Sequence, residues 1–123
     1  MLPGKLTTLE LYRGTPIYES YIFNYKEAGS LLPLDLRQYD SIRCQVKRKD
    51  HPFQTPIYEL SLGDGITISG DNFNVLTLIH TSEKTSQITA DGTHHRDLLF
   101  IQGTQKITLC KGKLNVTYNN TEP

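Results

Sequence analysis

The feature that most constrains the fold is an alternation of apolar and polar residues with a period of two. It is clearest between Ser41 and Lys49, where Ile42, Cys44 and Val46 share one face and polar or basic residues share the other. This period is typical of a β-strand with one buried face and one face in water. The segment is therefore predicted to be a central strand with its three apolar residues in the core.

Similar short segments recur along the chain, each bounded by Gly, Pro, Asn or Asp. The predicted strands are Leu9–Tyr12, Ile17–Tyr25, Ser41–Lys49, Tyr58–Leu62, Ile66–Ile68, Asn74–Thr81, Arg96–Gln102, and Gln105–Leu109 continuing through Leu114–Tyr118. Hairpin turns are expected at Gly63–Gly65 and Gly103–Thr104. A bulge or bend is expected at Gly112. One short helix is predicted over Ser82–Ile88, with Ser82 as its N-cap.

This pattern predicts an all-β fold: an antiparallel immunoglobulin-like β-sandwich of seven to eight strands with one short helical turn. A small barrel is the alternative. The length of 123 residues suits one domain, predicted over residues 1–118, with a polar tail over 119–123. The sequence has no apolar run long enough for a membrane-spanning helix and no signal-peptide core near its start, so no membrane association is expected.

Charge and cysteine content exclude further classes. Lys plus Arg and Asp plus Glu both number 13, so the formal net charge is zero. A dedicated nucleic-acid binder normally has a basic excess, and nucleic acid is therefore not the expected partner. Cys44 and Cys110 lack the spacing of a metal-ligand pair, and we expect two buried, reduced thiols.

No arrangement of residues predicts catalysis, a metal site or a cofactor. His94 and His95 are adjacent, so on a strand they point to opposite faces and cannot easily bind one ion; a surface pair is expected. Asp97 follows them, but no serine or cysteine stands in a nucleophile motif. Asp97 is interpreted as structural, and the chain is predicted not to be an enzyme.

Two groups of residues could contact a partner. The run Lys47–Lys49 lies near aromatic residues, a combination that could bind single-stranded nucleic acid; the favoured interpretation is a solvated strand end. Tyr12 and Tyr18 fall opposite the apolar residues of their strands, and exposed tyrosine is favoured at protein–protein contacts. They are therefore a candidate interface, with capping of the sandwich ends as the equal alternative.

The segment before the alternating strand is predicted to be a structural turn. It contains Asp35 among leucines and ends at Tyr39. An Asp side chain in a turn accepts hydrogen bonds from nearby backbone N–H groups. We expect Asp35 to do so and Tyr39 to anchor the turn to the sandwich edge.

The order of these motifs resembles the immunoglobulin-like structural domains of tailed bacteriophages, in particular the N-terminal domains of upper baseplate proteins and related tail or neck accessory proteins. The matching segments, in order, are Tyr12–Thr15, Leu34–Tyr39, Ile42–Lys49, Leu60–Ile68, Leu76–Thr85, Arg96–Leu98 and Gly112–Val116. The chain departs from the family pattern at Arg37–Gln38, where Thr-Gly is usual, and at Arg96, where Tyr is usual.

The resemblance implies a structural adaptor or accessory subunit of the tail, baseplate or neck. Its partners would be other virion proteins, in several copies within a ring or oligomer, and its location would be the virion, assembled in the bacterial host cytoplasm. The family implies no catalytic residue and no cofactor. Two alternatives remain open: a module that binds carbohydrate or another small ligand through exposed tyrosines, and a barrel that binds single-stranded nucleic acid through Lys47, Arg48 and Lys49.

Overall fold

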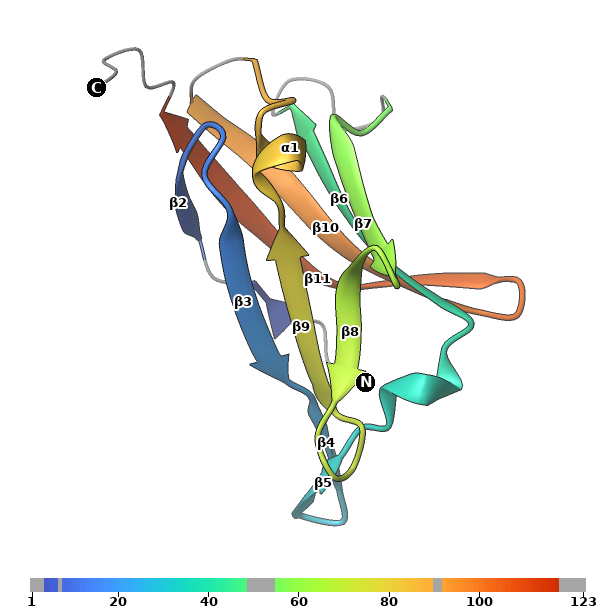
Figure 1. Ribbon diagram of the computed structural model, residues 1–123. Helices are drawn as coiled ribbons and strands as arrows, with labels where there is room; N and C mark the ends of the chain where they lie inside the picture. The colour runs from blue at the N-terminus through green and yellow to red at the C-terminus, as the bar shows by residue number, and fades with distance from the viewer. Residues whose placement is uncertain (1–3, 7, 49–54, 90–91, 118–123) are drawn as a thin grey trace.

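The computed structural model describes residues 4–6, 8–48, 55–89 and 92–117, and β-strands dominate it (Figure 1). The strands are β1 (Gly4–Lys5), β2 (Leu9–Tyr12), β3 (Ile17–Ile22), β4 (Asn24–Glu27), β5 (Ser30–Pro33), β6 (Ser41–Arg48), β7 (Tyr58–Leu62), β8 (Gly65–Ser69), β9 (Val75–His80), β10 (Gly92–Gln102) and β11 (Gln105–Thr117). A 3-10 helix, η1 (Leu36–Gln38), and one short α-helix, α1 (Ser82–Thr85), complete the described elements. The all-β prediction is confirmed, with more strands than the seven to eight expected. Lys49 and the predicted tail 119–123 lie outside the described residues.

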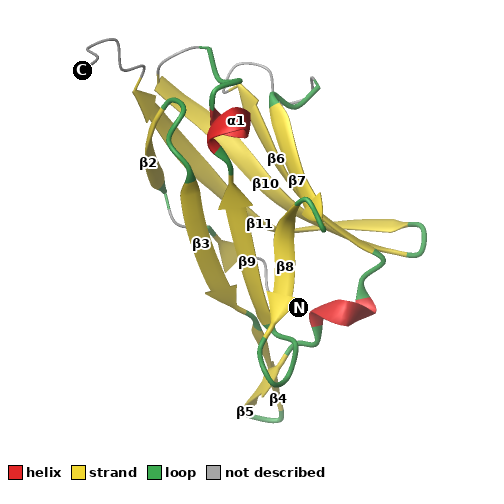
Figure 2. Cartoon of the chain, in the orientation of Figure 1, coloured by secondary structure: helices red, strands yellow, loops and turns green. Residues whose placement is uncertain are grey.

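One large sheet runs in the order β1-β11-β10-β6-β7-β8-β9-β3, with β2 also paired to β11, and β4 and β5 form a separate hairpin. The large sheet bends between β7 and β8. It thereby places β3, β9 and β8 in a front layer over a back layer of β11, β10, β6 and β7 (Figures 1 and 2). The two layers make the sheet sandwich-like. A turn also joins β2, which pairs with β11 at one end of the sheet, to β3 at the other end, so the sheet nearly closes into a barrel.

The pairing is not purely antiparallel. β1 and β2 both run parallel to β11, and β7 runs parallel to β8. The predicted hairpin at Gly63–Gly65 is therefore wrong: this turn carries the chain from the back layer to the front layer. Gly65 has φ +99°, and a Cβ there would lie 2.9 Å from the carbonyl oxygen of Ile79. The crossing needs glycine for both its backbone angle and its tight packing.

The long hairpin of β10 and β11 forms the middle of the back layer. Its register shifts between Leu98 and Leu99, whereas Gly112 pairs regularly with Arg96. The predicted bulge or bend is thus displaced from Gly112. A Cβ on Gly112 would lie 2.7 Å from the Cβ of Leu6. The glycine is explained by this close approach of the N-terminal segment and not by a bend.

The predicted strand Ile17–Tyr25 is interrupted after Ile22, where β4 and β5 begin a separate hairpin. Its turn passes through Ala28 at φ 51° and Gly29 at φ 82°. Two successive residues with positive φ are typical of a tight hairpin turn, but Asn-Gly or Asp-Gly is the usual sequence signal. The Ala-Gly pair gave no such signal, so this hairpin was not predicted.

The α-helix in the described residues is shorter than predicted, and its N-cap lies one residue before the predicted one. Thr81, not Ser82, is the N-cap, and its Oγ1 accepts a hydrogen bond of 3.3 Å from the Lys84 backbone N–H. The helical span is Ser82–Thr85. None of the helices in the described ranges is long and apolar enough to cross a membrane.

The core lies between the two layers. Leu76 and Leu78 of β9 and Ile66 of β8 face inward from the front layer, and all are fully buried. The prediction for β6 is confirmed, because Ile42, Cys44 and Val46 are also fully buried.

The two cysteines lie on strands that flank Leu98 of β10, and both are buried thiols, as expected. Burial raises the pKa of the Cys44 thiol to about 12. A thiol with this pKa stays protonated at neutral pH and is a poor nucleophile or metal ligand.

Candidate functional site

The most unusual chemical feature is a polar cluster inside the core. Glu19 projects from β3 and His80 from β9 in the front layer, while Arg96 projects from β10 and Tyr58 from β7 in the back layer. The side chains of Arg96 and His80 are fully buried, and that of Glu19 is 6% exposed. Buried charges persist in proteins only when they are paired and hydrogen-bonded. The cluster therefore has to satisfy its members internally.

Glu19 is the centre of this cluster. Its Oε2 lies 2.5 Å from Arg96 Nη1 and 2.7 Å from His80 Nε2, and its Oε1 accepts a hydrogen bond from the Tyr21 hydroxyl. Arg96 Nη2 also donates to the Tyr21 hydroxyl oxygen, at 3.1 Å. One carboxylate thus receives donors from three side chains, two of which come from its own layer and one from the opposite layer.

The cluster extends through His80 to the edge of the back layer. The Tyr58 hydroxyl lies 2.8 Å from His80 Nδ1, and the two rings pack edge to face with centroids 5.8 Å apart. A neutral imidazole protonated on Nε2 satisfies both contacts, because Nε2–H donates to Glu19 and Nδ1 accepts from Tyr58. Glu19, His80 and Tyr58 then form a continuous chain of hydrogen bonds across the core.

Burial and hydrogen bonds together determine whether the Glu19 carboxyl and the Arg96 guanidinium are charged. Burial acts to raise the pKa of Glu19, but hydrogen bonds from His80 and Arg96 outweigh it and leave that pKa below its usual value. Burial acts to lower the pKa of Arg96, and the adjacent carboxylate reverses this. Burial raises the pKa values of Tyr21 and Tyr58, so both hydroxyls stay protonated as donors. The pair is an ion pair at neutral pH.

The chain of Glu19, His80 and Tyr58 has the donor order of an acid–base relay, but all three side chains are buried. A relay acts on a reacting group within hydrogen-bond reach of its last member. Tyr58 is 5% exposed and its hydroxyl points at His80, inside the core. The arrangement instead joins the two layers at fixed positions, and this is its structural consequence.

The lowered pKa of Glu19 predicts a pH dependence of stability. Between the folded pKa and the unfolded value near 4.5, the unfolded chain binds more protons than the folded one. The contribution of Glu19 is therefore complete above pH 4.5 and is lost as pH falls through the folded pKa. We expect the free energy of unfolding, measured in urea at pH 7, 5, 4 and 3, to fall less steeply in Glu19→Gln than in the wild type. Parallel pH profiles would contradict this assignment.

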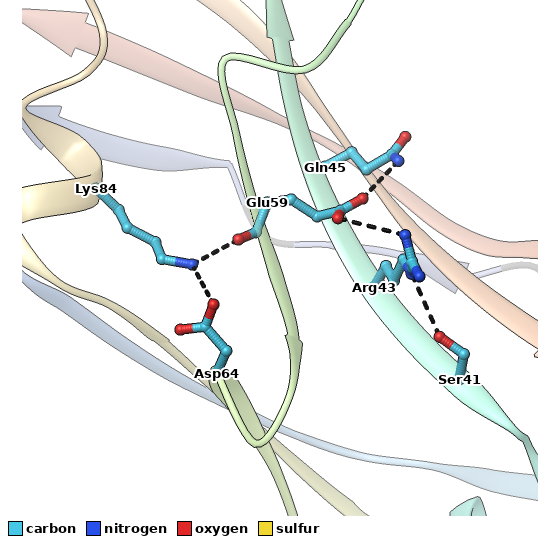
Figure 3. Close-up of polar contacts among 6 residues, drawn as sticks. All are labelled: Ser41, Arg43, Gln45, Glu59, Asp64 and Lys84. Carbon is cyan, nitrogen blue, oxygen red and sulfur yellow. Dashed lines mark hydrogen bonds and ion pairs between the residues drawn. The ribbon is translucent and has the colours of Figure 1, made fainter.

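The outer face of the back layer is charged. On β6 and β7, Glu59 accepts hydrogen bonds from Gln45 at 2.7 Å and from Arg43 at 3.5 Å (Figure 3). Lys84 of α1 reaches the same strand, because its Nζ donates to the Glu59 carbonyl at 2.6 Å and to Asp64 at 3.1 Å (Figure 3). The lysine covers a backbone acceptor of β7 and thus hinders pairing of another strand at this position.

The outer face of the front layer has the opposite character. We call it the uncharged face and define it by eight outward side chains, none of them charged: Tyr18, Ser20, Ile22, Thr67, Ser69, Val75, Thr77 and Ile79. Tyr18 is 73% exposed and Ile22 is 70% exposed. Charged residues occur instead in the turns and the helix at the strand ends, at Asp64, Asp71 and Glu83. A neutral centre with a charged rim is the usual anatomy of a protein interface.

The structure places the two candidate interface tyrosines on different strands. Both are exposed, Tyr12 to 59% and Tyr18 to 73%. Tyr12 ends β2, which pairs with β11, whereas Tyr18 lies on β3, which pairs with β9. Tyr18 belongs to the uncharged face and Tyr12 does not.

The segment around Asp35 and Tyr39 forms a compact turn, η1. The Asp35 carboxylate accepts from the Arg37 backbone N–H at 2.9 Å and pairs with the Arg37 guanidinium at 2.8 Å. Tyr39 is buried, and its ring packs edge to face on Phe100 with centroids 4.8 Å apart. The Arg37 guanidinium also stacks 3.5 Å from the ring centre of Phe73. These contacts fix the turn against the end of the sandwich.

The other candidate residues take mostly structural positions. His94 is 3% exposed and its Nδ1 lies 3.1 Å from the Gly92 carbonyl, so the prediction of a surface histidine pair is wrong for His94. Arg48 is exposed at the end of β6 although it is in phase with the buried residues. In the part of the chain that the structure describes, no group of three His, Cys, Asp or Glu side chains could hold a metal ion.

Comparison with known sequences adds no relative: no protein-family model and no curated protein matches this chain.

Proposed function

We propose that the chain is a non-enzymatic structural protein of a tailed-phage virion, an adaptor or accessory subunit of the tail, baseplate or neck. The order of the strand and turn motifs supports this proposal, together with a sandwich-like all-β fold. The finer fold, an immunoglobulin-like sandwich, belongs to the same proposal. Assembly in the bacterial host cytoplasm and a final location in the virion follow from it.

The uncharged face is the single observation that carries the proposal. Exposed apolar and aromatic side chains that gather on one face, within a polar rim, are typical of a surface that contacts a partner. Tyr18 and Ile22 stand outward on β3, where exposed tyrosine can bury much area at a small entropic cost. The partner would be another virion protein, and the contact would form without covalent chemistry.

The proposal is tested by co-expression with the tail, baseplate and neck proteins encoded near its gene. We expect the wild type to co-purify with one of them and Tyr18→Ser to lose at least about 1 kcal/mol of binding energy, as interface tyrosines commonly do. Binding can be quantified by calorimetry with the purified partner. If the wild type joins none of these complexes, the proposal fails.

Tyr12→Ser is the matched control, because it removes another exposed tyrosine ring, from β2 and outside the uncharged face. Loss of binding in Tyr18→Ser alone places the contact on the uncharged face. Loss in Tyr12→Ser alone moves the contact to β2.

Carbohydrate binding is the second candidate, favoured by the exposed tyrosine rings, which can stack on a sugar. A glycan array would show binding by the wild type that Tyr18→Ala abolishes. Glycan binding without any virion partner would replace the first proposal by the second.

A further inference from the structure

We propose that the outer edge of β3 binds an extended segment of a partner protein, which adds to the front layer as a further strand. This inference rests on the proposed function for the identity of the partner and names the part of that partner that binds. β3 is the last strand of the large sheet, and among the described residues it pairs with β9 alone. β1 and β2 both pair with β11 instead, so the break in the nearly closed barrel lies between β2 and β3 (Figure 1).

Half of the backbone groups of β3 point away from β9. The Phe23 backbone N–H donates to the Asn74 carbonyl at 2.8 Å, one position beyond the end of the β3–β9 register. Hydrogen-bonded and non-hydrogen-bonded pairs alternate along an antiparallel ladder, and side chains lie closer in the second kind. The bond of 2.9 Å between the Ser20 and Thr77 hydroxyls agrees with a non-hydrogen-bonded pair. The residues with outward N–H and carbonyl groups, which we call the open edge, are Tyr18, Ser20 and Ile22.

The open edge is complementary to the main chain of another strand. Its residues lie two positions apart, roughly 7 Å along the strand, and each offers one N–H donor and one carbonyl acceptor. No other segment among the described residues bonds to these backbone groups. An extended segment presents acceptors and donors at the same spacing, and its addition to a sheet edge is a common mode of peptide recognition. A partner that offers only neutral side chains would leave these groups bonded to water.

The inward side chains of β3 show that the core is incompletely covered at this edge. Tyr21 and Ile17 are partly buried, whereas their cross-strand partners on β9, Leu76 and His80, are fully buried. Leu9 of β2, across the break in the barrel, is also only partly buried. A strand added to β3 would place every second side chain beside Ile17 and Tyr21 and remove apolar surface from water. The partner segment should therefore carry apolar residues at alternate positions.

β3 has few of the features that protect a strand edge from pairing. Its six residues pair with β9 in a continuous register, and they include neither proline nor lysine. Its one charged residue, Glu19, points inward and is held by Arg96 and His80. The edge of β7 differs, because Lys84 covers the Glu59 carbonyl there. Strand addition is thus hindered at β7 and open at β3.

Hydrogen exchange measured by NMR tests whether the edge is open and whether a strand adds to it. In the free chain, the three amides of the open edge should exchange at least about tenfold faster than those of Glu19 and Tyr21, which face β9. The probe is a synthetic peptide of alternating valine and threonine with a lysine at each end, added from about 0.1 to 2 mM. It should slow exchange at the three outward amides by at least about threefold and leave Glu19 and Tyr21 unchanged.

Ser20→Pro is the variant that blocks the edge. Proline removes the outward N–H, and it is tolerated on an edge strand where that N–H faces solvent. Peptide binding should weaken at least about tenfold, through the lost hydrogen bond and the bulk of the ring. Ser20→Ala is the matched control, because it also loses the hydroxyl bond to Thr77 but keeps the N–H. It should bind the peptide as the wild type does, and urea denaturation checks that both variants fold.

The inference is overturned if the outward amides are protected in the free chain, if the peptide leaves them unprotected, or if Ser20→Pro and Ser20→Ala bind it equally. Protection that the chain gains alone as its concentration rises also overturns it, because the edge would then bind a second copy. If Ser20→Pro does not fold, exchange in the wild type decides.

Two results separate this inference from the proposed function. A virion protein that binds through Tyr18 without protecting the outward amides would disprove the inference and leave the proposed function standing. A peptide that protects the open edge, in a chain that joins no virion protein, would support the strand-binding edge and disprove the proposed function.

Discussion

Replacement of Arg96 by methionine is expected to lower the free energy of unfolding by about 3–5 kcal/mol, the cost of leaving one partner of a buried ion pair alone. In the folded variant, the Glu19 carboxylate would keep its hydrogen bonds with His80 and Tyr21. It would lose the ion pair with the Arg96 guanidinium. Natural domains have about 5–15 kcal/mol of stability in total. The variant should therefore unfold at a much lower urea concentration.

Two further variants distinguish the effect of an unpaired Glu19 charge from the effect of losing the packing of the Arg96 side chain. Glu19→Gln combined with Arg96→Met removes the stranded charge, so this double variant should be more stable than Arg96→Met alone. Arg43→Met is the matched control, since Arg43 and Glu59 form an exposed pair with 3.5 Å between the atoms. Exposed pairs contribute about 0–1 kcal/mol. Equal effects of Arg96→Met and Arg43→Met in urea titrations would show that the buried pair is not important for stability.

Replacement of Phe100 by alanine is expected to cost about 3–5 kcal/mol, through lost burial and the cavity that remains. Phe100 is fully buried in β10 and packs edge to face on Tyr39 and Phe23, with centroids 4.8 Å and 5.8 Å away. The same change should loosen the η1 turn, because the Tyr39 ring loses its support. Urea denaturation measures the first effect, and hydrogen exchange at residues 35–40 measures the second.

Phe73→Ala is the control for this prediction. Phe73 is 37% exposed and contacts the Arg37 guanidinium, so its loss should cost about 1 kcal/mol or less. Hydrogen exchange at η1 that stays unchanged in Phe100→Ala would mean that Tyr39 does not depend on Phe100 for its position.

The sequence was informative where a residue's environment depends on its own strand. The alternation in Ser41–Lys49 correctly placed Ile42, Cys44 and Val46 in the core. It could not place the crossing at Gly63–Gly65, because the turn signal is the same whether the next strand pairs with the previous one or enters the other layer. A Cβ on Gly65 would meet the Leu60 side chain of the preceding strand and the Ile79 backbone of a later strand, and the second contact cannot be read from the local sequence.

The buried cluster was visible in the sequence only as two irregularities. Glu19 broke the apolar face of its strand, and Arg96 stood where the resembling family has tyrosine. Both are explained by a contact between residues 77 positions apart. The pattern of one strand contains no information about such a partner. A charged residue on an apolar face can equally mean that the inward and outward residues of the strand were assigned wrongly. The available signal for the buried ion pair was the presence of two such exceptions of opposite charge, Glu19 and Arg96.

The parallel pairing of β2 with β11 has a consequence for how the chain folds. Leu9 pairs with Leu114, and the Asn115 amide donates to the Glu10 carboxylate across 105 positions of sequence. Closing a loop of this length is slow, because the chain loses conformational entropy before the contact contributes any stabilising free energy. During synthesis β2 has to wait for nearly the whole domain to emerge before its partner strand exists. Until then β2 and its apolar residues are available to other strands, including those of neighbouring nascent chains.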